Sequence, residues 1–277
     1  MKSLVIATLA LGITAAVAQP QGVVIKSSSK DVASGKVDRG MVMYVQGGMA
    51  RIENVDDRGR VKDFTIFRDS TFWDVDPSSR TFTRMDKATM IQMAQMANAR
   101  LEQMKTQMAS MPPERRAMVQ QMINHLEGKD GTDAAESKVE WKDAGQTEHV
   151  GQFTCHDWNE MRGDAISTQF CVTAWSAVPA GDQLAITMKR VSAFVQDMMS
   201  AAPFPAMTKS LAQKNPMAFA ATHGFPVVTR DFEGGKAYTE DVVSSVEPQV
   251  IDAGKFEIPK GFKEKSALSE MGNPGGH

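Results

Sequence analysis

The stretch CHDWNEMRGDAISTQFC, residues 155–171, holds both cysteines of the chain and decides how the surrounding fold is interpreted. Residues 162–164, Arg-Gly-Asp, form a turn signal between two half-polar runs. A hairpin centred on Gly163, with these three residues as its loop, places Cys155 directly opposite Cys171. The sequence therefore predicts two antiparallel strands that carry one cysteine each.

The same register sorts the other side chains of this hairpin into two faces. Alternate residues of a strand point to opposite faces. The polar face, which carries the cysteines, holds Asp157, Asn159, Ser167 and Gln169, and the apolar face holds Trp158, Ile166, Phe170 and Val172. Pairing of the cysteines and separation of the faces thus favour one register.

Two cysteines can form a redox pair, a metal site or a structural disulfide. A C-x-x-C motif is absent. A metal site needs His149 or His156 beside Cys155, but we expect His149 six residues away on the same strand and His156 on the opposite face. We therefore predict a disulfide between Cys155 and Cys171, closing a loop of about 15 residues.

The first 18 residues have the three-part layout of a secretory signal peptide. Lys2 precedes an apolar run from Leu4 to about Ile13, and Ala16 and Ala18 lead to a cut after Ala18. The run is too short to cross about 30 Å of hydrocarbon, so we expect cleavage and no membrane span in the mature chain. The prediction is a periplasmic or secreted protein of a Gram-negative bacterium, where oxidising conditions favour disulfides.

Charge argues against one class of partner. The chain has 277 residues with 31 Lys and Arg against 33 Asp and Glu, so removal of Lys2 with the signal leaves 30 against 33. No clustered basic face appears, although neutralising phosphates requires one. We expect no nucleic-acid partner.

Short antiparallel strands are the dominant pattern of the chain. β character runs over 23–85, 139–175 and from 225 onward. The clearest hairpin is MYVQGGMARIE, residues 43–53, which turns at its two glycines and pairs Val45 with Ala50 on an apolar face. Its other face, where Tyr44 lies opposite Arg51, is predicted to be mixed and wetter.

Between residues 86 and 127 the apolar period changes to that of a helix. Nine of the 20 methionines lie between Met85 and Met122. One stripe recurs at alternating spacings of four and three, at Met90, Ala94, Ala97, Leu101, Met104, Met108 and Met111. Pro112-Pro113 ends this helix and can begin another. We predict a Met-rich helical insertion over 86–127 and a polar loop after it.

Several fragments together resemble an uncharacterised family of exported bacterial proteins, a domain of unknown function. They are FWDVDPSSRTFTRM (72–85), VGQFTCHDW (150–158), FCVTAW (170–175), GFPVVTR (224–230) and KFEIPKGFK (255–263). The fold of this family is similar to that of the periplasmic lipoprotein carrier LolA. The resemblance implies an α+β fold, a curved antiparallel half-barrel with helices on its concave face, which in LolA holds acyl chains.

This chain departs from the LolA pattern in two ways. A plain carrier lacks the Met-rich insertion, and the cavity arginine of LolA has no position that can be assigned here. Fold alone does not determine function. We expect a single domain over 19–265, including the insertion, and a disordered tail over 266–277.

Catalytic signatures are absent from the sequence. There is no G-x-S-x-G, H-E-x-x-H or P-loop motif. We therefore expect a non-enzymatic binding protein, without cofactor or metal, whose apolar ligand, a lipid or acyl chain, lies between half-barrel and helices. The candidate ligand-binding residues are Met90, Met93, Leu101, Met104, Met108 and Trp73.

The methionines leave other interpretations open. A Met stripe at helical spacing is most simply core packing. One alternative function is an envelope protein-interaction or stress-sensing module, with another envelope protein as partner. A second is soft-metal (copper) binding through Met90, Met93 and Met96, but Met90 and Met96 diverge by about 120° around a helix. We also predict that 86–127 is a mobile lid over the concave face.

Overall fold

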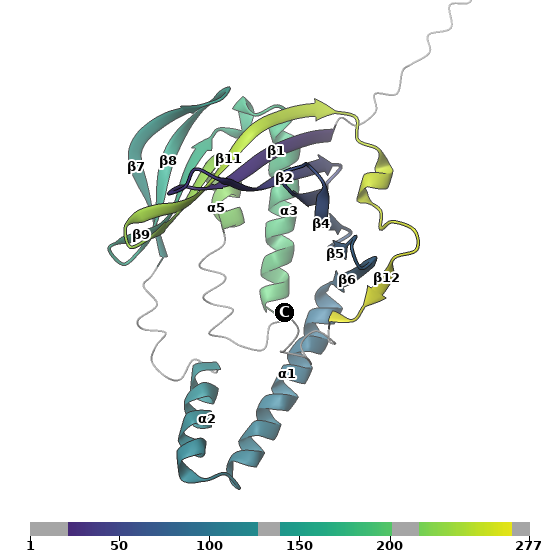
Figure 1. The fold of residues 1–277 in the computed structure, drawn as a ribbon, viewed down its shortest axis with the longest axis vertical. Helices are drawn as coiled ribbons and strands as arrows, with labels where there is room; N and C mark the ends of the chain where they lie inside the picture. Colours follow the sequence, from purple (N-terminus) through teal and green to yellow (C-terminus); the bar gives the residue numbers. More distant parts are fainter. Residues whose placement is uncertain (1–21, 127–138, 201–215, 268–277) are drawn as a thin grey trace, which may run out of the picture.

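The computed structural model describes residues 22–126, 139–200 and 216–267 (Figure 1). The predicted signal peptide, the polar loop at 127–138 and residues 268–277 of the predicted tail lie outside this part of the chain. The described residues form an α+β fold around one large sheet.

Twelve strands make up this sheet. They are β1 (Gly22–Asp31), β2 (Val37–Gln46), β3 (Met49–Val55), β4 (Val61–Arg68), β5 (Thr71–Asp76), β6 (Thr81–Met85), β7 (Val139–Val150), β8 (Phe153–Arg162), β9 (Ala165–Thr173), β10 (Phe225–Glu233), β11 (Lys236–Gln249) and β12 (Lys263–Lys265). The spatial order is β12-β6-β5-β4-β3-β2-β1-β11-β10-β9-β8-β7. Neighbours are antiparallel except β12, which pairs parallel with β6.

Helices occupy the remaining segments. They are α1 (Lys87–Met108), α2 (Pro113–Leu126), α3 (Gly181–Ser200) and α5 (Pro216–His223), with short 3-10 helices η2 (Trp175–Ala177) and η3 (Ala253–Phe256). Among the described residues, no helix combines the length and the apolar character needed to cross a membrane.

The β2–β3 hairpin has the predicted register, with Val45 opposite Ala50 and Tyr44 opposite Arg51. The prediction that the face of Arg51 is wetter is wrong. Arg51 is 8% exposed and Glu53 is 4% exposed, because η3 covers them. Arg51 Nε donates to Glu53 at 2.7 Å, and Lys255 Nζ of η3 lies 3.2 Å from the same carboxylate.

The disulfide between Cys155 and Cys171 is present, with Cα atoms 5.2 Å apart. The predicted register is wrong by two residues, because Asp157 and not Cys155 lies opposite Cys171. Arg162 pairs with Ala165 across a two-residue turn, and the register shifts once more between Glu160 and Met161. Beyond this bulge the total shift is two, so Asp157, Asn159 and Gln169 stay on the face of the cysteines, which still meet, diagonally. Nearer the turn the prediction is wrong, because Ile166 pairs with Met161 on the cysteine face and Ser167 bonds Glu160 on the other face.

His149 is also placed differently from the prediction. Gly151 has a φ of +57° and forms a turn that ends β7 at Val150. His149 therefore lies on β7, opposite Thr154 of β8, and not on the strand of Cys155. Only one glycine marks this turn in the sequence, a signal too weak to predict it.

Two helices follow β6 where the Met-rich pattern predicted them. Asp86 caps α1 by accepting a hydrogen bond from the Thr89 N–H at 2.8 Å, and Pro113 begins α2. Ala94 and Leu101 on the predicted stripe are buried. Figure 1 shows α1 and α2 as a hairpin that extends away from the sheet. Its start contacts β6 and α3.

Helix α3 runs beneath the middle of the sheet (Figure 1) and supplies much of the main core. Leu184, Val191 and Phe194 are buried with side chains of β1, β2 and β4. The Phe194 ring lies 5.7 Å from Phe67 and 5.5 Å from Phe72, in tilted arrangements. Such aromatic contacts hold the helix against the sheet.

The start of α3 depends on a close backbone approach. A Cβ at Gly181 would lie 1.8 Å from the Trp175 carbonyl oxygen. The preceding Ala180 has a φ of +55°, a conformation that favours glycine. We expect Gly181→Ala to lower the free energy of unfolding by about 1–3 kcal/mol through this clash. Ala180→Gly is the matched control and should leave stability unchanged or raise it. Urea unfolding measures both, and equal losses would contradict this account.

The disulfide should stabilise the fold by restricting the unfolded chain. Closing a loop of this length contributes about 3 kcal/mol in the chain-entropy model. We expect the double variant Cys155→Ala/Cys171→Ala to lose about this amount in urea unfolding under non-reducing conditions. Under reducing conditions the difference between wild type and variant should shrink. Two alkylatable thiols in the unreduced wild type would contradict the pairing.

Candidate functional site

An apolar pocket of about 150 Å³ lies between the sheet and α3. Four strands and two helical segments contribute to it. Its lining consists of Ile25, Ser27, Met41, Met43, Trp175, Leu184, Met188, Phe225, Pro226, Val227, Thr229, Asp241 and Val243. No described residue of α1 or α2 belongs to this lining. The pocket is therefore a property of the sheet and α3.

Strand alternation builds the pocket wall. Ile25 pairs with Met43, and Ser27 pairs with Met41, so β1 and β2 present these side chains on one face. Leu184 and Met188 are four residues apart on α3 and hence lie on one side of the helix. The apolar face predicted for the β2–β3 hairpin contains Met43. No local pattern indicated that α3 would leave a space against it.

One end of the pocket is polar. Thr229 of β10 lies directly opposite Asp241 of β11. Ser27 pairs with Val243, two residues along from Asp241. These three polar side chains line the pocket together, and Asp241 is its charged residue.

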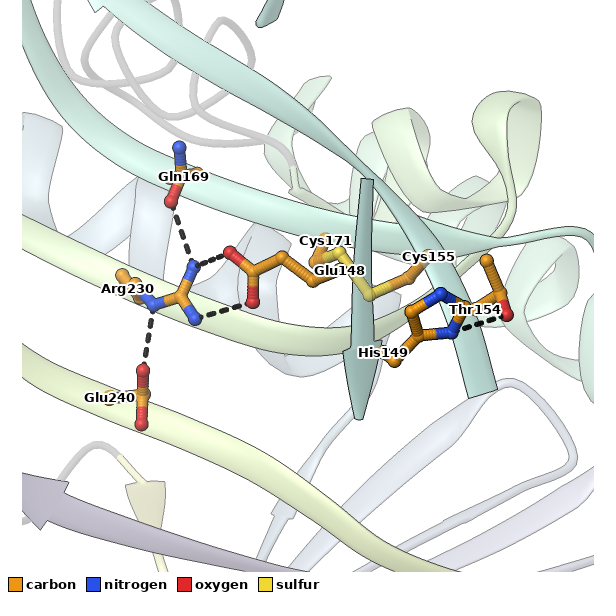
Figure 2. Close-up of a disulfide and its surroundings, with 8 residues drawn as sticks. All are labelled: Glu148, His149, Thr154, Cys155, Gln169, Cys171, Arg230 and Glu240. Atoms are coloured by element: carbon orange, nitrogen blue, oxygen red, sulfur yellow. Dashed lines mark hydrogen bonds and ion pairs between the residues drawn. A yellow bond between two sulfur atoms is a disulfide. The ribbon is translucent and has the colours of Figure 1, made fainter. Parts of the chain in front are cut away.

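An ionic cluster is centred on the opposite face of β10 and β11. It is defined here as Lys30, Glu148, Asp157, Arg230 and Glu240. Arg230 pairs with Glu240 next to the Thr229–Asp241 pair. Figure 2 shows Arg230 donating to Glu148, Glu240 and Gln169. Two of these bonds form a fork on Glu148, at 2.7 and 2.8 Å. Lys30 completes the cluster with a 2.6 Å contact to Glu240.

Asp157 is the unusual member of the ionic cluster. It is 1% exposed, and neither of its carboxylate oxygens has a hydrogen-bond partner in the described structure. Burial, and then the neighbouring Glu148 charge, raise the pKa of Asp157 to about 6. Hydrogen bonds from Arg230 hold the pKa of Glu148 below its ordinary value. The two carboxyl groups thus have opposite shifts.

Metal binding at this cluster is disfavoured by its chemistry. Glu148, Asp157 and Cys171 place ligand atoms within 4.8 Å of one another. However, the Cys171 sulfur is held in the disulfide, and Arg230 neutralises Glu148. A divalent cation needs free anionic or imidazole ligands. The cluster is therefore a structural network in this oxidised form.

One hydroxyl–imidazole pair resembles the nucleophile–base pair of a catalytic site. His149 Nδ1 lies 3.0 Å from Thr154 Oγ1 (Figure 2). The two residues are exposed and face each other across the β7–β8 hairpin. An activated nucleophile needs a base that a third group orients, inside a site that holds substrate. This pair is an ordinary cross-strand contact.

The structure distributes the six predicted ligand-binding residues over different surroundings. Trp73 packs beside Phe64, Ile66 and Val75, with the Arg68 guanidinium 5.2 Å above its ring. Met93 lines an open hollow over β4–β6. Met90, Leu101, Met104 and Met108 lie along α1. Met93 alone of the six lines one of the pockets described here, and the role of all six in binding stays a prediction.

Comparison with known proteins adds little. No protein-family model and no curated protein matches the chain. An uncharacterized conserved protein from Thermus thermophilus shares 6% identity at a TM-score of 0.42, over 89% of this chain and 91% of that chain. PNGF-II shares 11% identity at a TM-score of 0.33, over 91% of this chain but 32% of its own. Both scores are below 0.5, so neither likeness bears on fold or function.

Asp157 should make stability depend on pH. Its folded-state pKa of about 6 exceeds the ordinary 3.8, so between these values the folded state keeps a proton that the unfolded chain loses. Its stabilising contribution is complete below pH 3.8 and is lost as pH rises through about 6. Asp157→Asn should therefore gain stability relative to wild type between pH 4 and pH 7.

The measurement is urea unfolding of both proteins across this pH range. Asp164→Asn removes the same charge from the exposed tip of the β8–β9 hairpin and is the matched control. Its stability should follow wild type at every pH. Parallel curves for wild type and Asp157→Asn would show that Asp157 has the same pKa in both states.

Proposed function

We propose that this protein is a non-enzymatic binding protein that holds an apolar ligand between the sheet and α3. The observation that carries the proposal is the apolar pocket, whose lining is apolar except at one end. Apolar concave sites with a few convergent polar groups are the usual form of small-molecule sites. An open antiparallel sheet with one face packed against α3 also supports the carrier-like architecture that the resemblance to LolA implies.

The size of the pocket limits its ligand. At about 150 Å³ it matches an engineered cavity that binds benzene, and it is smaller than typical ligand pockets of about 300–1,000 Å³. In the described conformation it holds a ring or a short segment of an acyl chain. Met41, Met43 and Met188 line it, and flexible thioether side chains can repack around a longer chain.

The disulfide supports the proposed location. Disulfides persist in secreted and periplasmic proteins and are rare in reducing compartments. Together with the predicted signal peptide, this supports an exported protein, and we place it in the periplasm of a Gram-negative bacterium. The ligand is then an apolar molecule of the cell envelope, a lipid or an acyl chain.

A small apolar probe tests the pocket. Benzene should raise the melting temperature of the wild type, because a ligand that binds only the folded state stabilises it. Each kcal/mol of stabilisation corresponds to roughly 2–4 °C for a chain of this size. Met188→Trp fills the pocket and should abolish the shift.

Ile186→Trp is the matched control for this substitution. Ile186 lies on the same helix but is 52% exposed and outside the pocket. This variant should keep the response to benzene. If the wild type does not respond, or if Met188→Trp responds equally, the pocket is not a binding site. If the wild type does respond, mass spectrometry of gently purified protein would identify its natural ligand.

A second candidate function is a protein-interaction module, and the α1–α2 hairpin favours it. Met118 and Met122 of α2 are 72% and 47% exposed, and Ile91 of α1 is 40% exposed. Met118 and Met122 are four residues apart on α2 and so lie on one side of it, and contiguous exposed apolar patches mark docking surfaces. The lid and copper-binding hypotheses concern the same hairpin and stay predictions.

A further inference from the structure

We propose that the pocket selects apolar ligands that carry a protonated amine, with Asp241 as the counter-ion. This inference rests on the proposed function, because it names the chemical class of ligand for the same pocket. It starts from the one ionisable side chain that the described residues contribute to the lining.

Asp241 differs from the acidic residues around it. Its side chain makes no ion pair or hydrogen bond within the described ranges of the chain. Glu240, the preceding residue, is paired with Arg230 and Lys30 on the opposite face. Asp231 on the neighbouring strand accepts hydrogen bonds from Thr168 and Thr239 at 3.2 and 3.1 Å. Asp241 is thus available to a ligand.

Two hydroxyl groups share the pocket lining with this carboxylate. Thr229 faces Asp241 across the β10–β11 pair, and Ser27 lies on the next strand, β1. Both side chains line the pocket. An alkylammonium group has three N–H donors and no acceptor. The polar end therefore matches it with one carboxylate and two hydroxyl oxygens, while the alkyl part contacts Leu184 and Met188.

Among the residues that the structure describes, no nearby cation offsets this negative charge. Lys30 is held by Glu240, and Arg230 points to the opposite face. Arg39 follows the alternation of Met41 on β2, but it is exposed and does not belong to the lining. A carboxylate ligand would place its charge against Asp241, which is unfavourable in a partly buried site. Free fatty acids are accordingly predicted to bind poorly.

Three probes of equal chain length separate these charges. Isothermal titration of wild-type protein at pH 7 and low salt compares n-hexylamine, n-hexanol and hexanoate. We expect n-hexylamine to bind more tightly than n-hexanol by roughly 10- to 100-fold, the range of a charged hydrogen bond. Hexanoate should bind most weakly. This comparison needs no variant.

Asp241→Asn isolates the counter-ion. It should weaken n-hexylamine binding roughly 10- to 100-fold and leave n-hexanol binding within about twofold. Asp231→Asn is the matched control, because it removes a carboxylate two residues beyond Thr229 and outside the lining. It should leave all three affinities unchanged.

The outcomes distinguish this inference from the proposed function. Equal affinities for amine and alcohol, or tighter binding of hexanoate, would overturn the inference, and the latter would point to Arg39. If benzene stabilises the wild type but n-hexylamine does not bind, the pocket stands and the amine selectivity is wrong. If neither binds, the proposed function fails and this inference fails with it.

Discussion

Hydrogen bonds from the Arg230 side chain join β10 to three other strands of the sheet. From β10 it donates to Glu148 on β7, Gln169 on β9 and Glu240 on β11. Strands β7 and β10 are three positions apart in the sheet, about 14 Å in a flat arrangement with a spacing of about 4.8 Å. Arg230 and Glu148 therefore bridge two intervening strands, β8 and β9. Asp157 and the disulfide between Cys155 and Cys171, on the same face of these intervening strands, are buried.

The same strands present the pocket on their other face. Thr229 and Arg230 are consecutive, as are Glu240 and Asp241, and the β10–β11 register pairs them two by two. Strand alternation therefore places the pocket and the ionic cluster back to back. A one-residue slip would exchange them, leaving Arg230 in an apolar pocket and Asp241 beside Glu148. The paired charges on one face thus specify the register that forms the pocket on the other.

Local signals in the sequence predicted most strands and helices, but they missed the turn at Gly151 and did not show how the elements assemble. The Gly-Gly turn after Gln46 predicted the β2–β3 register to the residue, because a two-residue turn allows one pairing. At Gly163 the predicted three-residue loop is a two-residue turn, and a bulge in β9 adds a second one-residue shift that no local signal indicated. Burial of Arg51 could not be predicted, since its cover comes from η3, about 200 residues further along the chain.

The pocket also depends on contacts between segments that are far apart in the sequence. Its walls come from strands near both ends of the chain and from α3, so no window of sequence contains it. The density of methionines predicted ligand contacts within residues 86–127, whereas the pocket is lined by the isolated Met41, Met43 and Met188. The apolar character of the site was therefore predictable from strand patterning, but its position depended on long-range packing.

An open sheet has two edges, and edges are where chains pair with one another. β12 ends one side of the order and β7 the other. β12 is three residues long, all of them charged, and it covers β6 through a parallel pairing. A chain that ended before Lys263 would expose the backbone of β6 and the half-buried Phe82. The C-terminal segment thus protects the protein against edge-to-edge aggregation.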